Sequence, residues 1–188
     1  MRHKYSTTAL VLGRFPNGEV STKVALLTPD FGLIRAHAQG LRKPGAKMAC
    51  ALQTFSTADI TLIRAKDGWR LTGAILNCNF AQILPLASKK RAARITSLAE
   101  RLTYGEQTEP HLYPMILSYL EILPSLTEEE QDAAECLAAL RILSALGHDA
   151  GEIPGEAITF DKDSLETITK ERTAYISRIN NGILVSGL

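Results

Sequence analysis

The side chains that most often perform chemistry are few and widely separated in this sequence. No histidine has a partner at HxH or HExxH spacing; the four are His3, His37, His111 and His148. The three cysteines have no CxxC spacing and no paired histidines nearby; they are Cys50, Cys78 and Cys136. These spacings predict neither a zinc site nor a disulfide framework, and they give a nucleophile no neighbouring base. We therefore expect no catalytic residue, no metal and no cofactor.

Acidic and glycine-rich motifs give the same expectation. Glu128–Glu130 stands in the first turn of a predicted helix, where each carboxylate stabilises the helix dipole by ~0.3–1 kcal/mol. That role explains the run better than a metal site does. The sequence contains no GxxxxGK[ST] motif and no GxGxxG motif after a strand, so nucleotide binding is disfavoured.

Basic residues are the groups that could do chemistry here, by binding phosphate. Residues 1–94 carry fifteen Lys and Arg against four Asp and Glu, whereas the rest of the chain carries six against sixteen, giving +11 and −10. A polyanion-binding half followed by an acidic half would produce this asymmetry. The alternative is an ordinary solvated surface, although such a surface would contain more acids.

The bases predicted to contact nucleic-acid phosphates fall into three groups. One lies in a Gly- and Pro-rich link and consists of Arg42, Lys43 and Lys47. Another lies at the domain junction, at the start of a helix whose dipole disfavours cations, and consists of Lys89, Lys90, Arg91 and Arg94. We expect these four cations to bring no local structural benefit, which points to a functional role. The third lies on barrel strands and their turns and consists of Arg14, Lys23, Arg35, Arg64 and Lys66, with Arg70 close to the last two. The candidates for base stacking are Phe15, Phe31 and Trp69, each of which could equally be core.

Two kinds of periodicity indicate the elements that must position these bases. Turn signals separate five predicted strands, at residues 7–15, 20–27, 32–38, 55–64 and 69–80. From Ser88 the apolar period becomes about 3.6, which predicts helices over residues 88–104, 110–123, 127–147 and 162–180. Thr127 and Glu130 form a predicted capping box. We expect an α+β protein with an N-terminal five-stranded OB-fold barrel at residues 1–82 and an α-helical domain at residues 83–188.

The segment predicted to form the barrel resembles the N-terminal domain of the RecO family of bacterial recombination mediators. The resemblance rests on Gly18-Glu19, Leu27-Thr28 and Gly32, then on Ala38-x-Gly40 followed by bases and on Leu52-Gln-x-Phe55. It covers about the first eighty residues. Later, LAALRILSALG is similar to a family helix ending in Leu-Gly, but the four-cysteine zinc module of some members is missing.

Membership would imply a non-enzymatic DNA repair protein. Such a protein binds single- and double-stranded DNA, anneals complementary strands, and works with RecR and the acidic C-terminal tail of single-stranded-DNA-binding protein to load RecA. We would expect it in the bacterial cytoplasm, associated with the nucleoid. The alternatives are a protein-protein adaptor whose OB-fold does not bind DNA, and a nuclease, which the four widely spaced N-terminal acids disfavour.

Two further expectations concern partners and compartment. Arg141 lies between Leu140 and Ile142, so we expect its guanidinium to emerge beside an apolar stripe and to bind a partner's acidic tail. An ion pair with Glu135, or simple solvation, is the alternative. No apolar run reaches the ~18–20 residues of a membrane span, and the N-terminal apolar run soon meets a charge, so we expect no membrane association and no secretory signal.

Overall fold

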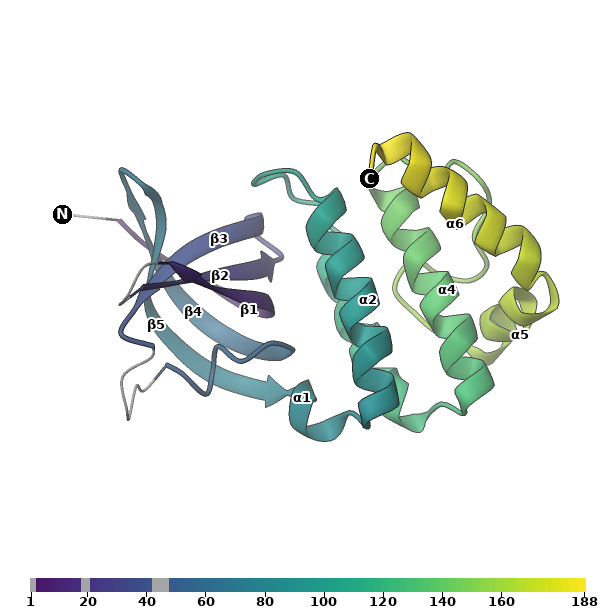
Figure 1. Ribbon diagram of the computed structural model, residues 1–188, viewed down its shortest axis with the longest axis horizontal. Coiled ribbons are helices and arrows are strands. Elements are labelled where there is room, and N and C mark those ends of the chain that lie inside the picture. The colour runs from purple at the N-terminus through teal and green to yellow at the C-terminus, as the bar shows by residue number, and fades with distance from the viewer. Residues whose placement is uncertain (1–2, 18–20, 42–47) are drawn as a thin grey trace. The chain divides into compact units, whose positions relative to one another are not determined.

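Two compact units make up the part of the chain that the computed structural model describes, residues 3–17, 21–41 and 48–188 (Figure 1). The barrel unit consists of Met1–Ile83 together with Gly105–Thr108. The helical unit consists of Leu84–Tyr104 together with Glu109–Leu188. The chain therefore leaves the barrel unit after residue 83, returns to it for four residues, and leaves it again.

The strands of the barrel unit close on one another. Their bounds are β1 Lys4–Asn17, β2 Ser21–Thr28, β3 Gly32–Gln39, β4 Ser56–Ala65 and β5 Gly68–Asn79. They pair in the order β1-β2-β3-β5-β4, with β4 returning to β1, and every pair is antiparallel except β3 with β5. A closed five-stranded barrel of this order is an OB-fold, so the predicted fold class is confirmed.

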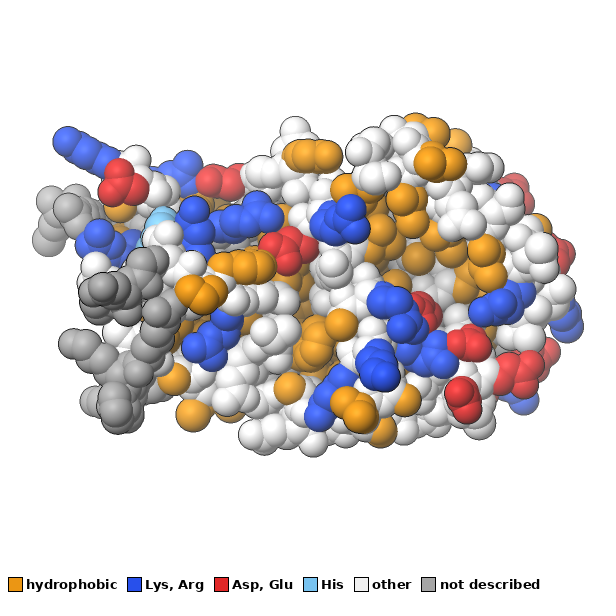
Figure 2. Space-filling view, viewed as in Figure 1, with side chains coloured by type: hydrophobic (Ala, Val, Ile, Leu, Met, Phe, Trp, Pro, Cys, Tyr) orange, Lys and Arg blue, Asp and Glu red, His pale blue; other side chains and the backbone are white. Residues whose placement is uncertain are grey.

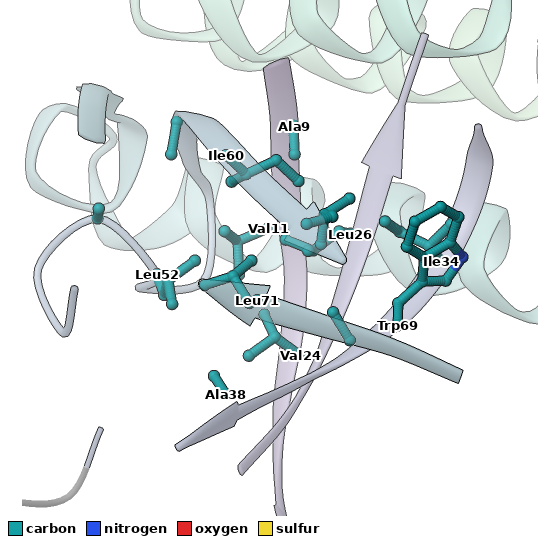
Figure 3. Packing of buried hydrophobic residues seen from close by; sticks show 14 of the residues in the cluster. Ala9, Val11, Val24, Leu26, Ile34, Ala38, Leu52, Ile60, Trp69 and Leu71 are labelled. Carbon is teal, nitrogen blue, oxygen red and sulfur yellow. The ribbon is translucent and has the colours of Figure 1, made fainter. Parts of the chain in front are cut away.

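Inward-facing and outward-facing side chains alternate along each strand, and the inward-facing ones fill the barrel. Val24, Leu26, Ile34 and Leu71 are almost fully buried and belong to one hydrophobic cluster. Figure 3 shows their side chains converging from different strands. Because successive strand residues point to opposite faces, the residues between them lie on the outside of the barrel.

One end of the barrel is covered by aromatic rings and by the returning segment. Tyr5 makes edge contacts with Phe31 and Trp69, at 5.8 and 5.3 Å between ring centroids. Gly32, at φ 62°, leaves no room for a Cβ because the main chain of Gln107 lies against it. Glu106 then reaches Trp69 and Arg64. Gly105–Thr108 is therefore part of the barrel's structure.

Helices account for most of the remaining chain. Their bounds are α1 Phe80–Ile83, α2 Leu86–Leu102, α3 Leu112–Ile122, the 3-10 turn η1 Leu123–Ser125, α4 Glu128–Ala145, α5 Lys162–Lys170 and α6 Arg172–Ser186. Of these, α1 lies in the barrel unit. The predicted final helix is wrong as a single element, because the chain breaks at Glu171 between α5 and α6.

Helix α4 is the centre of the helical unit. It packs against α2, α3, α5 and α6, and Leu137, Leu140 and Leu143 are completely buried. Its N-terminus has the predicted capping box: the Thr127 hydroxyl accepts from the Glu130 amide, and the Glu130 carboxylate accepts from the Thr127 amide at 2.8 Å.

Candidate nucleic-acid interface

Four side chains form a continuous row across the outer surface of the barrel. Strand register pairs Phe15 of β1 with Lys23 of β2, Lys23 with His37 of β3, and His37 with Arg70 of β5. Paired residues share one face of a sheet. The alternate residues on these strands, such as Val24, are core. Phe15, Lys23, His37 and Arg70 are hereafter called the outer row.

The outer row is available to a ligand. Lys23 and Arg70 make no hydrogen bond or ion pair within the described part of the chain. Phe15 is 46% exposed, which leaves its ring open to stacking on a base. His37 Nδ1 lies 3.2 Å from the Asn17 amide nitrogen, a contact that helps to orient the imidazole. Lys and Arg side chains are visible over the strands in Figure 2.

Strands β1, β4 and β5 present a different surface. Register places Ser6, Thr61 and Gly73 side by side, followed by Thr8, Asp59 and Ile75. These six positions carry one acid and no base, and Asp59 is used locally, because it accepts a hydrogen bond from Asn77 at 3.0 Å. Charge is therefore unevenly distributed over the outside of the barrel, and the two cations of the outer row lie on β2 and β5.

The other predicted barrel cations are not all in the outer row. Arg14 pairs with Val24, so it lies on the opposite face of the sheet from Phe15. Arg35 is exposed on the outer face of β3, and Lys66 is exposed in the β4–β5 turn.

Arg64 forms an ion pair with Glu106 at 2.5 Å, and its guanidinium lies 4.7 Å from the centre of the Trp69 ring. Arg42, Lys43 and Lys47 lie outside the described residues.

At the start of α2 the predicted cluster divides into two kinds of residue. Lys89 and Lys90 make no ion pair within the described residues, and Lys90 is exposed. Arg91 pairs with Asp132 and Glu135 of α4, and Arg94 binds Glu135 at 2.7 Å. Burial lowers the pKa of Arg91, but hydrogen bonds to the two acids outweigh it and raise that pKa overall. The expectation that these cations bring no local structural benefit is thus wrong for Arg91 and Arg94, which tie α2 to α4.

Arg141 does not emerge at the surface as predicted. Its side chain is 5% exposed and donates to the carbonyls of Thr159, at 2.6 Å, and Pro154, at 3.3 Å. The guanidinium also lies over the Phe160 ring at 4.8 Å, and burial lowers its pKa to about 10. Neither alternative, pairing with Glu135 or solvation, is what the structure has. Arg141 holds the α4–α5 loop, and its role toward a partner stays a prediction.

His37 is the member of the outer row that the sequence does not predict, because it has no motif partner there. Arg70 is predicted only as a base close to Arg64 and Lys66, with no place on the barrel surface. Strict alternation with the core residues Ala36, Ala38 and Leu71 was the signal that could have placed both on the outer face. Of the stacking candidates, Trp69 is core, at 6% exposed.

The helical unit contains a groove of about 450 Å³ between α2, α4 and α6. Its apolar lining includes Ile95, Leu98, Ile176, Ile179 and Ile183. Charged side chains border the groove, namely Arg91, Arg94, Arg172, Asp132 and Glu135. Figure 2 shows hydrophobic side chains gathered between α2 and α6. Such a groove suits a short segment with both apolar and acidic groups.

A search of the described residues finds no cluster of three or more His, Cys, Asp or Glu side chains placed to hold a metal ion. In the same part of the chain, none of the helices combines the length and the apolar character needed to span a membrane.

Comparison with known proteins gives consistent matches. Residues 1–74 match the family model described as Recombination protein O N terminal. Three proteins named DNA repair protein RecO are similar to the chain. That of Dehalococcoides mccartyi strain 195 is 30% identical over 68% of this chain and 51% of its own length. Those of Gloeobacter violaceus and Myxococcus xanthus are 31% and 30% identical, over 79% and 85% of this chain and 57% and 68% of their own lengths. The chain spans about half the length of the first of these relatives.

Proposed function

This chain belongs to the RecO family, and from that premise we propose that it is a DNA-binding recombination mediator in DNA repair. It binds single- and double-stranded DNA and anneals complementary single strands. With RecR and single-stranded-DNA-binding protein it helps to load the recombinase RecA. It acts by binding, without a catalytic residue of its own.

The observation that carries the proposal is the outer row. Annealing brings two polyanions together, and their repulsion is the main obstacle. Lys23 and Arg70 offer unpaired charges that neutralise phosphates and release counterions, while Phe15 offers a ring to an unstacked base. Charges on flexible stems do not read sequence, so base pairing supplies the specificity.

The partner side of the proposal rests on the groove between α2, α4 and α6. The acidic tail of single-stranded-DNA-binding protein would lay apolar groups on Ile95 and Ile179 and place a carboxylate near Arg172. This groove is a better candidate for the tail than Arg141, because Arg141 is 5% exposed and its guanidinium already donates to two main-chain carbonyls. RecR is proposed as a partner on family membership alone.

The test is DNA affinity and annealing of the double variant Lys23→Ala, Arg70→Ala. Loss of two phosphate contacts should weaken single-strand binding roughly tenfold and reduce the slope of log K against log salt by about 1.4. The matched control is Lys162→Ala, Lys170→Ala, which removes the same charge from α5, where each lysine pairs with Glu166. The control should bind and anneal as the unmodified protein does.

Two outcomes would contradict the proposal. If the unmodified protein gives no salt-dependent shift of DNA at moderate salt, the adaptor alternative is favoured. If both double variants bind DNA equally well and circular dichroism shows them folded, the outer row does not bind phosphate.

A further inference from the structure

A small polar pocket lies beside the outer row. Its volume is about 120 Å³, and it opens between the end of β3 and the β4–β5 turn. The side that β3 provides includes His37 and Gln39, while the turn and the start of β5 provide Asp67, Gly68 and Arg70. His37 and Arg70 thus belong both to the outer row and to the pocket, so a strand of DNA bound along the row passes the pocket mouth.

Asp67 is the unexpected member of this pocket. Of the other acids described in the barrel strands and turns, Asp30 accepts a hydrogen bond from Thr7 at 2.5 Å and Asp59 accepts one from Asn77. Asp67 makes no hydrogen bond or ion pair within the described residues. An unpaired carboxylate beside a phosphate-binding row repels phosphate. Both of its carboxylate oxygens can accept hydrogen bonds from a ligand.

The hydrogen-bonding groups of the pocket have complementary chemistry. Asp67 is an acceptor with two oxygens, Arg70 is only a donor, and the Gln39 amide is both. A phosphate would meet Asp67, so the pocket does not suit the DNA backbone. A base edge that presents adjacent donors beside an acceptor would satisfy the carboxylate and the guanidinium together.

We propose that this pocket binds one unstacked guanine of single-stranded DNA. The Watson–Crick edge of guanine presents N1–H and N2–H side by side, followed by the O6 acceptor. Asp67 accepts from the two donors, and Arg70 or Gln39 donates to O6. Adenine and cytosine each present one amino donor beside acceptors on that edge, and thymine presents one imide donor between two carbonyls, so none of them fills both carboxylate oxygens.

This inference rests on the proposed DNA-binding function and adds a base preference at one position. Most of the affinity still comes from phosphate contacts, so binding remains tolerant of sequence elsewhere. One well-placed bidentate contact corresponds to ~1–3 kcal/mol of discrimination. Because the pocket is open to water, we expect the preference to be at the low end, roughly fivefold.

The experiment compares short oligothymidylates carrying one central guanine, adenine, cytosine or abasic site, by fluorescence anisotropy with the full chain. The guanine oligonucleotide should bind roughly fivefold more tightly than the others. Asp67→Asn should remove that preference while leaving affinity for plain oligothymidylate equal or higher, since a carboxylate leaves the phosphate-binding side. Asp59→Asn is the matched control: it removes the same charge from the β1–β4–β5 surface and should keep the guanine preference.

A second readout uses Trp69, which lines the pocket and is the single tryptophan of the chain. Guanosine monophosphate should quench its fluorescence in the unmodified protein and much less in Asp67→Asn. Equal binding of all four oligonucleotides, with no effect of Asp67→Asn, would overturn the guanine site while leaving the proposed function intact. Failure of every oligonucleotide to bind would overturn both.

Discussion

The indole N–H of Trp69 donates to the carboxylate of Glu106 at 3.0 Å. The same carboxylate oxygen pairs with Arg64, whose guanidinium lies over the indole ring. A residue from beyond α2 thus satisfies the one polar atom of a core tryptophan, and it does so from a segment whose main chain also packs on Gly32.

Glu106→Ala should expose to water the end of the barrel that Gly105–Thr108 covers. The Arg64 ion pair is half exposed and contributes little, but the Trp69 N–H would lose its partner. We expect about 1 kcal/mol of lost stability and a red shift of Trp69 emission as water reaches the indole. Urea unfolding followed by fluorescence measures both. Glu121→Ala, an exposed acid on α3, is the control, and an unchanged emission maximum in Glu106→Ala would refute the contact.

Arg141→Ala should destabilise the helical unit by roughly 2–3 kcal/mol, because two carbonyls and the Phe160 ring lose a buried cation. Thermal unfolding by circular dichroism measures the loss, with Arg101→Ala on the exposed side of α2 as the control. A variant as stable as the unmodified protein would mean that the loop does not depend on this side chain. The destabilisation also means that a loss of partner binding in Arg141→Ala would not by itself identify a contact.

Substitutions of the bases at the start of α2 should differ in their effect on stability, because Arg91 is paired and Lys90 is not. Arg91→Ala should cost about 2 kcal/mol, because Asp132 and Glu135 are left without their cation at a site where Arg91 is 13% exposed. Lys90→Ala should change stability by less than about 0.5 kcal/mol. Urea midpoints compare the two. If the predicted DNA contact at this cluster is correct, Lys90→Ala will weaken DNA binding without that loss of stability.

Asp161 should give the helical unit a measurable acid dependence. Hydrogen bonds from the Ser164 hydroxyl and amide lower the pKa of Asp161, with a smaller contribution from Arg141. Because the pKa of Asp161 is lower in the folded state than in the unfolded state, the ionised side chain stabilises the fold at pH values above the unfolded pKa. This stabilisation is lost as the pH falls through the folded pKa. Asp161→Ala should therefore cost about 1 kcal/mol at neutral pH, and the difference should shrink as the pH falls below the ordinary aspartate pKa of about 3.9 and through the lowered folded pKa. Asp161→Asn, which still caps α5, should cost less at neutral pH; a difference independent of pH would contradict the assignment.

The barrel could be read from the sequence because its signals are local. Alternation and turn residues such as Gly18 and Gly68 place all five strands within a few residues of their observed bounds. The break at Glu171 could not be read, since no Gly or Pro marks it and the packing of α5 and α6 on α4 decides it.

Contacts between distant residues explain the other differences. Nothing near Arg141 in the sequence reveals that carbonyls thirteen and eighteen residues away will enclose it. Nor does the spacing of Arg91 and Glu135 show that α2 and α4 lie together. The basic character of the barrel was visible in composition, whereas the outer row required the register of four strands.

The return of Gly105–Thr108 to the barrel also has a consequence for synthesis. A nascent chain that has just delivered β5 from the ribosome holds every strand of the barrel, yet Gly32 and Trp69 still lack the segment that covers them. About thirty more residues must emerge, including all of α2, before that end closes. The barrel unit is therefore completed by residues that follow α2, and this end of it cannot close until α2 has been synthesised.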